Sequence, residues 1–217
     1  MSVARTAETA APTAFVVEDD ESIRTLWRWL MESNGIAVRT FTSADEFIGD
    51  YRPGTPGCLV LDLRLPGMSG LELQGYLKRQ RIEIPIVFVT AHGDVRTAVT
   101  AMQEGAVDFI EKPFSYRQAV AIVEKAFRRD AERREQLERH AQVAARFATL
   151  TGRERAVLRC VIAGKLNKVI ADELDISVKT VEFHRAKLME KMGVDSVAGL
   201  VQVTLGFSLM DGPKAHG

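Results

Sequence analysis

The stretch Cys58-Leu59-Val60-Leu61-Asp62-Leu63-Arg64-Leu65-Pro66-Gly67-Met68-Ser69-Gly70 decides how the chain is interpreted. Its short apolar run, bounded by turn residues, is typical of a strand buried on both faces of a sheet. The run ends in the carboxylate of Asp62, and Pro66, Gly67 and Gly70 then predict a loop before the next helix. Ligands of open α/β sheets bind at the carboxyl ends of strands. Asp62 is therefore either a reactive or metal-binding group, or a structural cap on the loop.

The composition is that of a soluble protein long enough for two domains. The chain has 217 residues, of which 46% are hydrophobic and 27% charged. Lys plus Arg and Asp plus Glu number 29 each, so any DNA-binding surface must be local. Cys58 and Cys160 lie far apart in apolar runs and predict buried free thiols in a reducing compartment.

The sequence carries no membrane or export signal. No apolar run approaches the ~20 residues that a membrane helix needs. Residues 1–13 are rich in Ala and Thr and lack the apolar core of a signal peptide. We therefore expect a disordered tail on a cytoplasmic protein that makes no membrane contact.

Strands and helices alternate five times between residues 14 and 128. This alternation predicts an α/β domain with a five-stranded parallel sheet covered on both faces. Three of the helices begin at capping patterns, which are Ser43 with Glu46, Ser69 with Glu72, and Ser115 with Gln118. The expected strands are Ala14–Val17, Ile36–Phe41, the run that ends at Asp62, Ile84–Val89 and Val107–Ile110.

Polar side chains follow these strands at one edge of the predicted sheet. Glu18 and Asp19 follow the first strand, Asp62 ends the third, Thr90 follows the fourth, and Lys112 follows the fifth. Clustered carboxylates repel one another unless a cation lies among them, and oxygen ligands favour Mg²⁺. A carboxylate nucleophile, Mg²⁺ and a cationic clamp together predict a site that accepts a phosphoryl group.

Several of these residues have a simpler explanation when each is taken alone. Thr90 can be an ordinary turn residue, and Lys112 before a proline can be a solvated loop charge. Phe109 in the fifth strand can be part of the core. Only their combination with Asp19 and Asp62 favours a functional site.

The combination resembles the receiver domain of two-component response regulators over residues 13–128. The motifs that carry the resemblance are Glu18-Asp19, Asp62, Pro66-Gly67, Thr90-Ala91 and Lys112-Pro113-Phe114. It implies a flavodoxin-like fold. It also implies that Asp62 takes a phosphoryl group from a histidine kinase. Such a domain is no classical enzyme, but Mg²⁺-dependent self-phosphorylation and slow self-dephosphorylation of Asp62 are expected.

The resemblance also implies a role for each matching residue. Asp19, Asp62 and the backbone carbonyl of Arg64 would bind Mg²⁺ directly, and Glu18 would hold it through water. Lys112 would contact the phosphoryl oxygens, and a cis peptide bond is expected before Pro113. The switch residues Thr90 and Phe109 would move on phosphorylation and couple the site to the surface of the fourth helix and fifth strand.

Residues 129–147 are strongly charged and rich in good helix formers, with neither Gly nor Pro before Gly152. A thin apolar stripe through Leu137 and Ala141 favours a helical linker between two domains. A solvated flexible linker is the alternative.

Residues 148–211 predict an all-α domain of four helices. Thr151 with Glu154 forms a capping box, and Asn167 is expected to cap the second helix. A tight turn at Asp175-Ile176-Ser177 then leads into the helix Val178–Met192, which gives a helix-turn-helix.

The helix Val178–Met192 has two distinct faces. Val181, Leu188 and Met192 fall on the core side, whereas Lys179, Phe183, Ala186 and Glu190 point away from it. Phe183 and Ala186 suit apolar contact with a thymine methyl, and Glu182 suits a cytosine amine. Lys179 and Lys187 suit phosphates. Alternatively, Phe183 packs against a neighbouring side chain or a dimer mate.

This half resembles the LuxR-type DNA-binding domain of the NarL and FixJ class, and the whole chain resembles the FixJ-like group. The carrying residues are Leu150-Thr151-Gly152-Arg153-Glu154, Asn167-Lys168, Ile170-Ala171, Ile176-Ser177, Lys179 to Arg185, and Lys191 to Val194. The resemblance implies that Glu182, Phe183 and Ala186 contact bases and that Lys179, Thr180 and Lys187 contact the DNA backbone. Lys168 is also expected to bind DNA. The last helix, with Val197, Leu200 and Val201, would supply the dimer contact or close the core.

Together these features predict a phosphorylation-dependent transcription regulator that binds a two-fold site on double-stranded DNA as a homodimer. Two alternatives remain. An aspartate-nucleophile phosphatase would need a second carboxylate in Asp62-Leu63-Arg64, which is absent. The second alternative is a transcription regulator that uses a receiver-like interaction domain without phosphorylation.

Overall fold

The computed structural model describes residues 11–90 and 95–211 and divides the chain into two compact units. The first unit ends at Arg134 and the second begins at Glu135. Most of the predicted tail, together with Ala91 of the receiver motif, lies outside the described residues.

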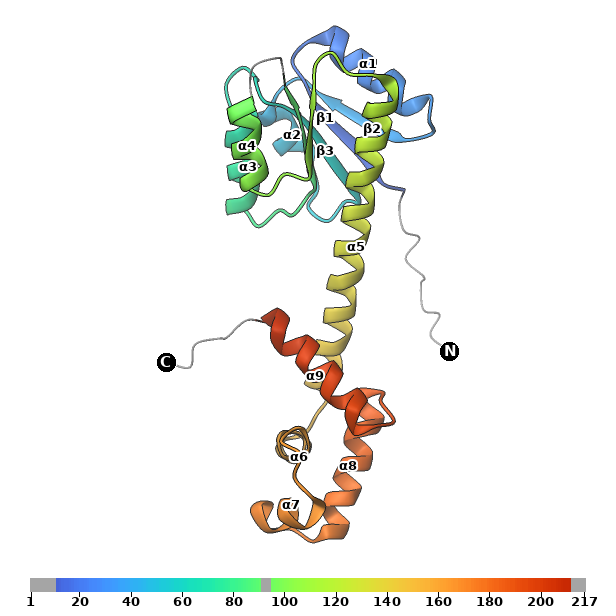
Figure 1. Cartoon of the computed structure of the whole chain (residues 1–217), viewed down its shortest axis with the longest axis vertical. Helices are drawn as coiled ribbons and strands as arrows, with labels where there is room; N and C mark the ends of the chain where they lie inside the picture. Colours follow the sequence, from blue (N-terminus) through green and yellow to red (C-terminus); the bar gives the residue numbers. More distant parts are fainter. Residues whose placement is uncertain (1–10, 91–94, 212–217) are drawn as a thin grey trace. The chain divides into compact units, whose positions relative to one another are not determined.

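The first unit contains a five-stranded parallel sheet in the order β2-β1-β3-β4-β5 (Figure 1). The strand order reverses at β1, which has β2 on one side and β3 on the other. In open α/β sheets this reversal opens a crevice at the carboxyl ends of the two central strands. The predicted α/β class is therefore confirmed. The strands are β1 Thr13–Val17, β2 Ala37–Phe41, β3 Gly57–Asp62, β4 Ile86–Thr90 and β5 Asp108–Glu111.

Helices cover both faces of the sheet (Figure 1). Successive side chains of a strand point to opposite faces, so each central strand contributes to two cores. In β3, Leu59 and Leu61 pack under α2, α3 and α4, whereas Cys58 and Val60 pack under α1 and α5. The helices are α1 Glu21–Glu32, α2 Ala44–Asp50, α3 Gly70–Arg79, α4 Val95–Gln103 and α5 Tyr116–Ala148.

The cysteines behave as the sequence predicts. Cys58 and Cys160 are both buried free thiols. Burial raises the pKa of the Cys58 thiol well above its usual range, so this side chain is part of the core rather than a reactive group.

Of the capping patterns predicted in the first unit, one differs, at α2. Ser69 and Glu72 form a reciprocal capping box at α3. At α2, Ser43 accepts the N–H of Glu46 at 3.2 Å, but the Glu46 carboxylate accepts from the backbone N–H of Thr42 at 2.6 Å instead of Ser43. A second donor, the Thr42 hydroxyl at 2.7 Å, explains this choice.

Strand β4 begins two residues later than the sequence predicts, at Ile86 instead of Ile84. Pro85 lies between the two positions and has no N–H to donate to a ladder. Its carbonyl still accepts the Leu59 N–H at 2.8 Å.

The charged segment predicted as a linker is helical. Helix α5 is a single helix from Tyr116 to Ala148. The predicted domain boundary at residue 128 stays a prediction, but contacts with the sheet unit continue beyond it through Asp130, Arg133 and Arg134.

The second unit packs short helices around one apolar core. Leu150, Val157, Ile170, Leu188 and Leu200 are among its buried residues. Its helices are α6 Gly152–Ile162, α7 Asn167–Leu174, α8 Val178–Met192 and α9 Val197–Asp211. The turn between α7 and α8 contains Asp175 at φ 51°, so the predicted helix-turn-helix is confirmed.

The predicted cap of α7 is wrong. The residue before the first turn is Leu166, which makes no side-chain cap, and Asn167 is already helical. The Asn167 side-chain oxygen instead accepts a hydrogen bond from the Arg185 guanidinium at 2.7 Å. A tertiary contact between α7 and α8 has therefore taken the group that a local cap would use.

Among the described helices, none combines the length and the apolar composition that crossing a membrane requires.

We expect Glu154→Gln to destabilise the second unit by about 1 kcal/mol, because a charged hydrogen bond to Lys191 is lost. The buried Glu154 carboxylate accepts from Lys191 Nζ at 2.7 Å and from the Thr151 N–H at 2.8 Å. These bonds hold the pKa of Glu154 below its ordinary 4.5. The stabilisation is thus present above pH 4.5 and lost as the pH falls through the lowered pKa.

Urea unfolding, monitored by hydrogen exchange of the amides in residues 152–192, measures the stability of the second unit separately from that of the first. The matched control is Glu190→Gln, which removes an exposed carboxylate of α8 that pairs with Lys187 at 2.8 Å. Equal stability of the two variants at neutral pH would contradict the expectation.

Candidate functional site

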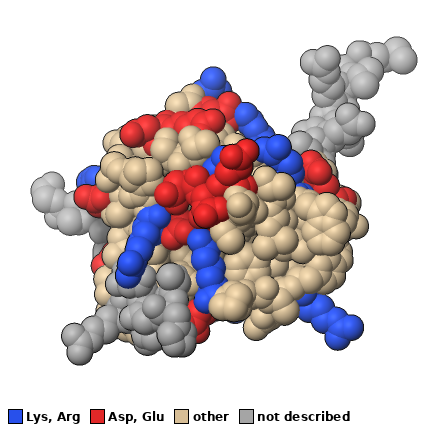
Figure 2. Space-filling model, turned by 90° about the horizontal axis from the view of Figure 1, so that it is seen from above, with Lys and Arg blue, Asp and Glu red and all other residues tan. Residues whose placement is uncertain are grey.

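Three carboxylates meet at the carboxyl edge of the sheet, where β1 and β3 end. Oxygen atoms of Glu18, Asp19 and Asp62 lie within 4.8 Å of one another. Glu18 and Asp62 are buried, and Asp19 is exposed. Figure 2, which looks onto this end of the first unit, shows acidic side chains gathered at the centre of the face. The donor set consists only of oxygen atoms, which fits a small hard cation such as Mg²⁺.

Lys112 joins this cluster from the loop after β5. Its ammonium nitrogen lies 2.5 Å from Asp62 Oδ2 and 2.8 Å from Glu18 Oε2, and its side chain is 22% exposed. Lys112 is therefore not a solvated loop charge. Burial opposes its charge, but the hydrogen bonds to Asp62 and Glu18 outweigh it and raise the pKa of Lys112. The expected cis bond between Lys112 and Pro113 is present.

The electrostatics of the cluster are unbalanced towards negative charge. Burial, together with the neighbouring Asp62, raises the pKa of Glu18 to about 7, against the opposing hydrogen bond from Lys112. One ammonium therefore does not fully compensate the carboxylates around it.

The backbone around Asp62 is tightly fixed. Asp62 Oδ1 accepts the Arg64 N–H at 2.8 Å. A Cβ at Gly70 would overlap the Asp62 carbonyl oxygen, so only glycine allows α3 to begin so close to β3. The Arg24 guanidinium donates to the carbonyls of Glu18 at 2.9 Å and Asp19 at 3.0 Å. Arg24 could not be identified from the sequence, since a lone Arg on the exposed side of a helix gives no signal.

The two predicted switch residues lie in different environments. Thr90 is buried at the end of β4, one position beyond Val89, the register partner of Asp62. Its carbonyl accepts the Lys112 N–H at 2.8 Å. Phe109 on β5 is 43% exposed, which rules out the alternative of simple core packing.

The predicted DNA-contact residues are on the outside of the second unit. Val181, Leu188 and Met192 of α8 are fully buried, as the helical wheel predicts. Lys179, Glu182, Phe183, Ala186 and Lys187 of α8 and Lys168 of α7 are exposed, and Thr180 is half-buried beside Ser177.

Phe183 is the most unusual residue of this surface. It is 59% exposed, and its ring meets that of His184 edge-on at a centroid distance of 5.6 Å. Within the described residues, Phe183 is therefore no part of the apolar core of the second unit, and His184 is the neighbouring ring that it contacts. Lys187 is paired with Glu190 at 2.8 Å, so this lysine would have to share its charge with any phosphate.

The carboxyl end of α8 is held by residues that sequence analysis did not identify. Arg146, near the end of α5, donates to the Met192 carbonyl at 3.0 Å. Lys191 donates to the Thr149 carbonyl at 3.1 Å. These bonds satisfy carbonyl groups at helix ends and fix the orientation of α8 within its unit.

A carboxylate cluster paired with a lysine in one unit and a helix-turn-helix in the other are typical of one class, the DNA-binding regulators that receive a chemical signal. The comparison with known families gives the same division. Residues 14–124 match the response regulator receiver domain, and residues 148–204 match the bacterial regulatory proteins of the luxR family. The chain belongs to the response regulators that carry a luxR-type DNA-binding domain, which are transcription regulators rather than classical enzymes.

Named relatives resemble the chain over nearly its full length. Nodulation protein W of Bradyrhizobium diazoefficiens is 44% identical over 196 residues, which cover 89% of this chain and 86% of that protein. The transcriptional regulatory protein FixJ of Azorhizobium caulinodans is 43% identical over 88% of this chain and 90% of its own length.

Solved structures show the same architecture. The response regulator StyR is 46% identical, with a TM-score of 0.83 over 90% of this chain and 99% of that one. Full-length FixJ from B. japonicum is 39% identical, with a TM-score of 0.58 over 91% of this chain and 98% of its own.

Proposed function

We propose that Asp62 is the phosphoryl acceptor of this transcription regulator and that a sensor histidine kinase is the donor. The observation that carries the proposal is the position of Asp62: it ends a central strand at the point where strand order reverses, and Lys112 Nζ lies 2.5 Å from its Oδ2. A carboxylate so placed can react as a nucleophile while an ammonium stabilises the anion that it receives.

The transfer balances as a simple exchange of bonds. A carboxylate oxygen of Asp62 bonds to the phosphorus, the bond from phosphorus to the kinase imidazole breaks, and its electron pair returns to the imidazole nitrogen. Lys112 holds the phosphoryl oxygens. The Thr90 hydroxyl donates a hydrogen bond to the phosphoryl group, which shifts Thr90 and with it Phe109.

Mg²⁺ is the cofactor that the acidic cluster supports. Asp19, Asp62 and the carbonyl of Arg64 would bind it directly, and Glu18 through water. When bound, the ion neutralises negative charge on the carboxylates and on the incoming phosphoryl oxygens.

The DNA-binding surface is the exposed face of α8 together with Lys168. Glu182, Phe183 and Ala186 contact bases, while Lys168, Lys179, Thr180 and Lys187 contact the backbone. Phosphorylation favours a homodimer, whose two recognition helices match a two-fold DNA site. Because it acts on bacterial genomic DNA, the protein works in the cytoplasm.

Removal of Mg²⁺ tests this proposal directly. Genomic fragments selected by the protein supply the DNA, and beryllofluoride serves as the phosphoryl mimic. With Mg²⁺ and beryllofluoride we expect affinity for the selected DNA to rise about ten-fold or more, a usual size for coupling between two sites. With EDTA in place of Mg²⁺ the gain should disappear, because the mimic needs the cation to bind.

Sedimentation of the same samples without DNA reports the monomer–dimer equilibrium. Equal DNA affinity and equal self-association in all samples would refute the phosphorylation-dependent function. It would favour the alternative regulator that works without phosphorylation.

A further inference from the structure

One residue of α5 is a carboxylate where the core pattern calls for an apolar side chain. The residues of α5 that face the sheet recur at helical spacing, and the last of them is Asp130, which is 3% exposed. The earlier members of this stripe are Ala119, Ile122, Val123 and Ala126.

The Asp130 carboxylate is fully engaged. Oδ2 accepts the backbone N–H of Gly57 at 3.0 Å and the Arg134 Nε–H at 2.5 Å. Oδ1 accepts from the Arg133 guanidinium at 2.8 Å. The bond to Gly57 links α5 to the first residue of β3, far away in the sequence.

Arg134 extends the attachment to the loop before β3. Its two terminal nitrogens donate to the carbonyls of Gly54 at 2.8 Å and Thr55 at 2.7 Å. Arg134 is also the last residue of the first compact unit. We call Asp130, Arg134 and their three backbone partners, Gly54, Thr55 and Gly57, the α5 anchor.

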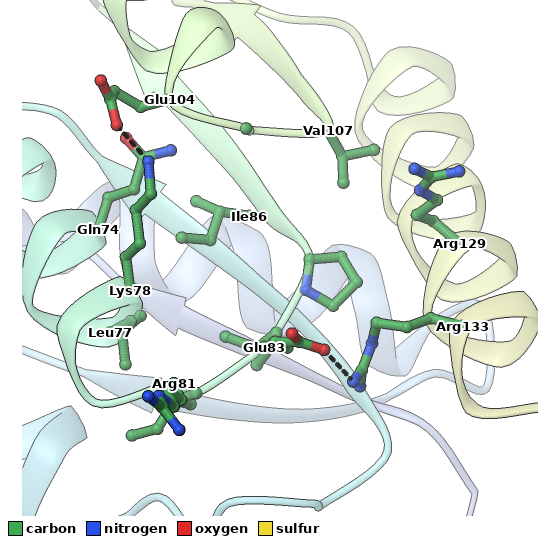
Figure 3. Close-up of a pocket in the computed structure, with 14 residues that line it drawn as sticks. Gln74, Leu77, Lys78, Arg81, Glu83, Ile86, Glu104, Val107, Arg129 and Arg133 are labelled. Atoms are coloured by element: carbon green, nitrogen blue, oxygen red, sulfur yellow. Dashed lines mark hydrogen bonds and ion pairs between the residues drawn. The ribbon is translucent and has the colours of Figure 1, made fainter. Parts of the chain in front are cut away.

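Arg133 adds a weaker tie to a second loop. Figure 3 shows it reaching Glu83 beside a pocket of about 530 Å³, and Arg133 Nη1 lies 3.2 Å from Glu83 Oε2. Glu83 is well exposed, so this pair contributes little to stability.

Stability alone does not explain the anchor. A buried ion pair usually stabilises a fold no better than apolar residues of the same volume would, because desolvation offsets the attraction. An apolar side chain in place of Asp130 would still bury α5, but it would not fix the rotation of the helix about its axis. Directional hydrogen bonds to three backbone groups do fix it.

The anchor lies on the strand that carries the phosphoryl acceptor. Strand β3 begins at Gly57, ends at Asp62 and is buried along its whole length. We propose that Asp130 and Arg134 are positioning residues: they set the direction in which α5 leaves the receiver, and phosphorylation of Asp62 changes DNA binding only while they do so. This inference rests on the proposed function, because it concerns how the signal from that site reaches α5.

The test compares two anchor variants with a matched control. Arg134→Met keeps an apolar stem but removes the bonds to Gly54 and Thr55. Asp130→Asn keeps an acceptor for the Gly57 N–H but loses the charge that holds Arg134. The control is Arg139→Gln, since Glu135 and Arg139 form a pair with the same spacing on the same helix, 3.2 Å apart and well exposed to solvent.

Three readouts separate positioning from folding. The first is uptake of phosphoryl groups from acetyl phosphate, which should stay within about two-fold of wild type. The second is protection of the Gly57 amide from hydrogen exchange, which should fall in Asp130→Asn, because an uncharged amide oxygen is a weaker acceptor than the carboxylate. The third is the gain in DNA affinity on adding Mg²⁺ and beryllofluoride, which should drop from about ten-fold to below about three-fold in both anchor variants.

The outcomes are distinct. A full gain in both anchor variants, equal to that of Arg139→Gln, overturns the proposal. Loss of phosphoryl uptake in both also overturns it, because the residues would then support the receiver as a whole. Absence of any gain in the wild type would instead refute the proposed function, and the inference with it.

Discussion

Asp62→Asn is expected to reduce phosphoryl uptake from acetyl phosphate by at least about 100-fold, because an amide oxygen is a poor nucleophile. The substitution changes little else in shape. The amide oxygen that replaces Asp62 Oδ1 can still accept the Arg64 N–H, which lies 2.8 Å away in the wild type. Lys112 keeps its bond to Glu18 at 2.8 Å. Intact mass after incubation with Mg²⁺ and acetyl phosphate measures the phosphorylated fraction.

Asp45→Asn is the matched control, because Asp45 is an exposed carboxylate in the first turn of α2. It should take up phosphoryl groups at the wild-type rate. Phosphoryl groups on the Asp62→Asn chain at a wild-type level would identify a different acceptor.

The same variant separates the two functional alternatives. If phosphorylation is the switch, Asp62→Asn should not respond to the donor in DNA binding. If Asp62→Asn binds DNA as tightly as the activated wild type, the receiver acts as an interaction domain without phosphorylation.

The cluster of carboxylates and Lys112 could be predicted from the sequence because its geometry follows from topology. Carboxyl ends of parallel strands meet at one edge, so Glu18, Asp62 and Lys112 converge although 94 and 50 residues separate Lys112 from its two partners. Identifying the strands was enough to bring these side chains together. Boundary errors such as that of β4 did not matter, since the carboxyl ends of the strands differ from the predicted ends by no more than one residue.

Contacts chosen by competition between partners could not be predicted. Asn167 is a good helix cap by type, but Arg185 on α8 offers it a charged donor. Glu46 likewise bonds to Thr42, which presents two donors. Such choices depend on where other elements lie, which local patterns do not contain.

The α5 anchor lies between these cases. The spacing from Ala126 to Asp130 continues the core stripe, so the sequence does hold a signal of a buried carboxylate. Within a run of alternating charges that signal is indistinguishable from a solvated helix face. Only the structure supplies the partners, which are backbone groups around residues 54–57.

The other large effect is expected on the recognition helix. Phe183→Ala should weaken binding to selected DNA by about ten-fold while leaving binding to random DNA unchanged, since an apolar base contact contributes to specificity. The domain should stay folded, because the Phe183 side chain is 59% exposed. Trp29→Ala is the control: Trp29 is 60% exposed on α1 of the other unit and should have no effect on DNA binding.

Lys179→Gln should give the opposite pattern. Loss of a phosphate contact lowers the affinity for every DNA sequence. It also reduces the slope of log affinity against log salt by about 1. Lys78→Gln on α3 removes a lysine that pairs with Glu104 at 2.7 Å and serves as the control. Titrations of selected and random DNA at several salt concentrations measure both the affinity and its salt slope.

The contrast between the two variants decides what Phe183 does. A base contact predicts loss of discrimination with an unchanged salt slope. If Phe183 packs against a dimer mate instead, Phe183→Ala will weaken self-association in the absence of DNA and lower affinity for selected and random DNA alike. Because Lys179 is one turn away on the same exposed face, its variant shows that this surface meets DNA whichever role Phe183 has. Two results together would mean that this face of α8 does not enter the groove. Lys179→Gln would leave the salt slope unchanged, and Phe183→Ala would discriminate selected from random DNA as well as the wild type does.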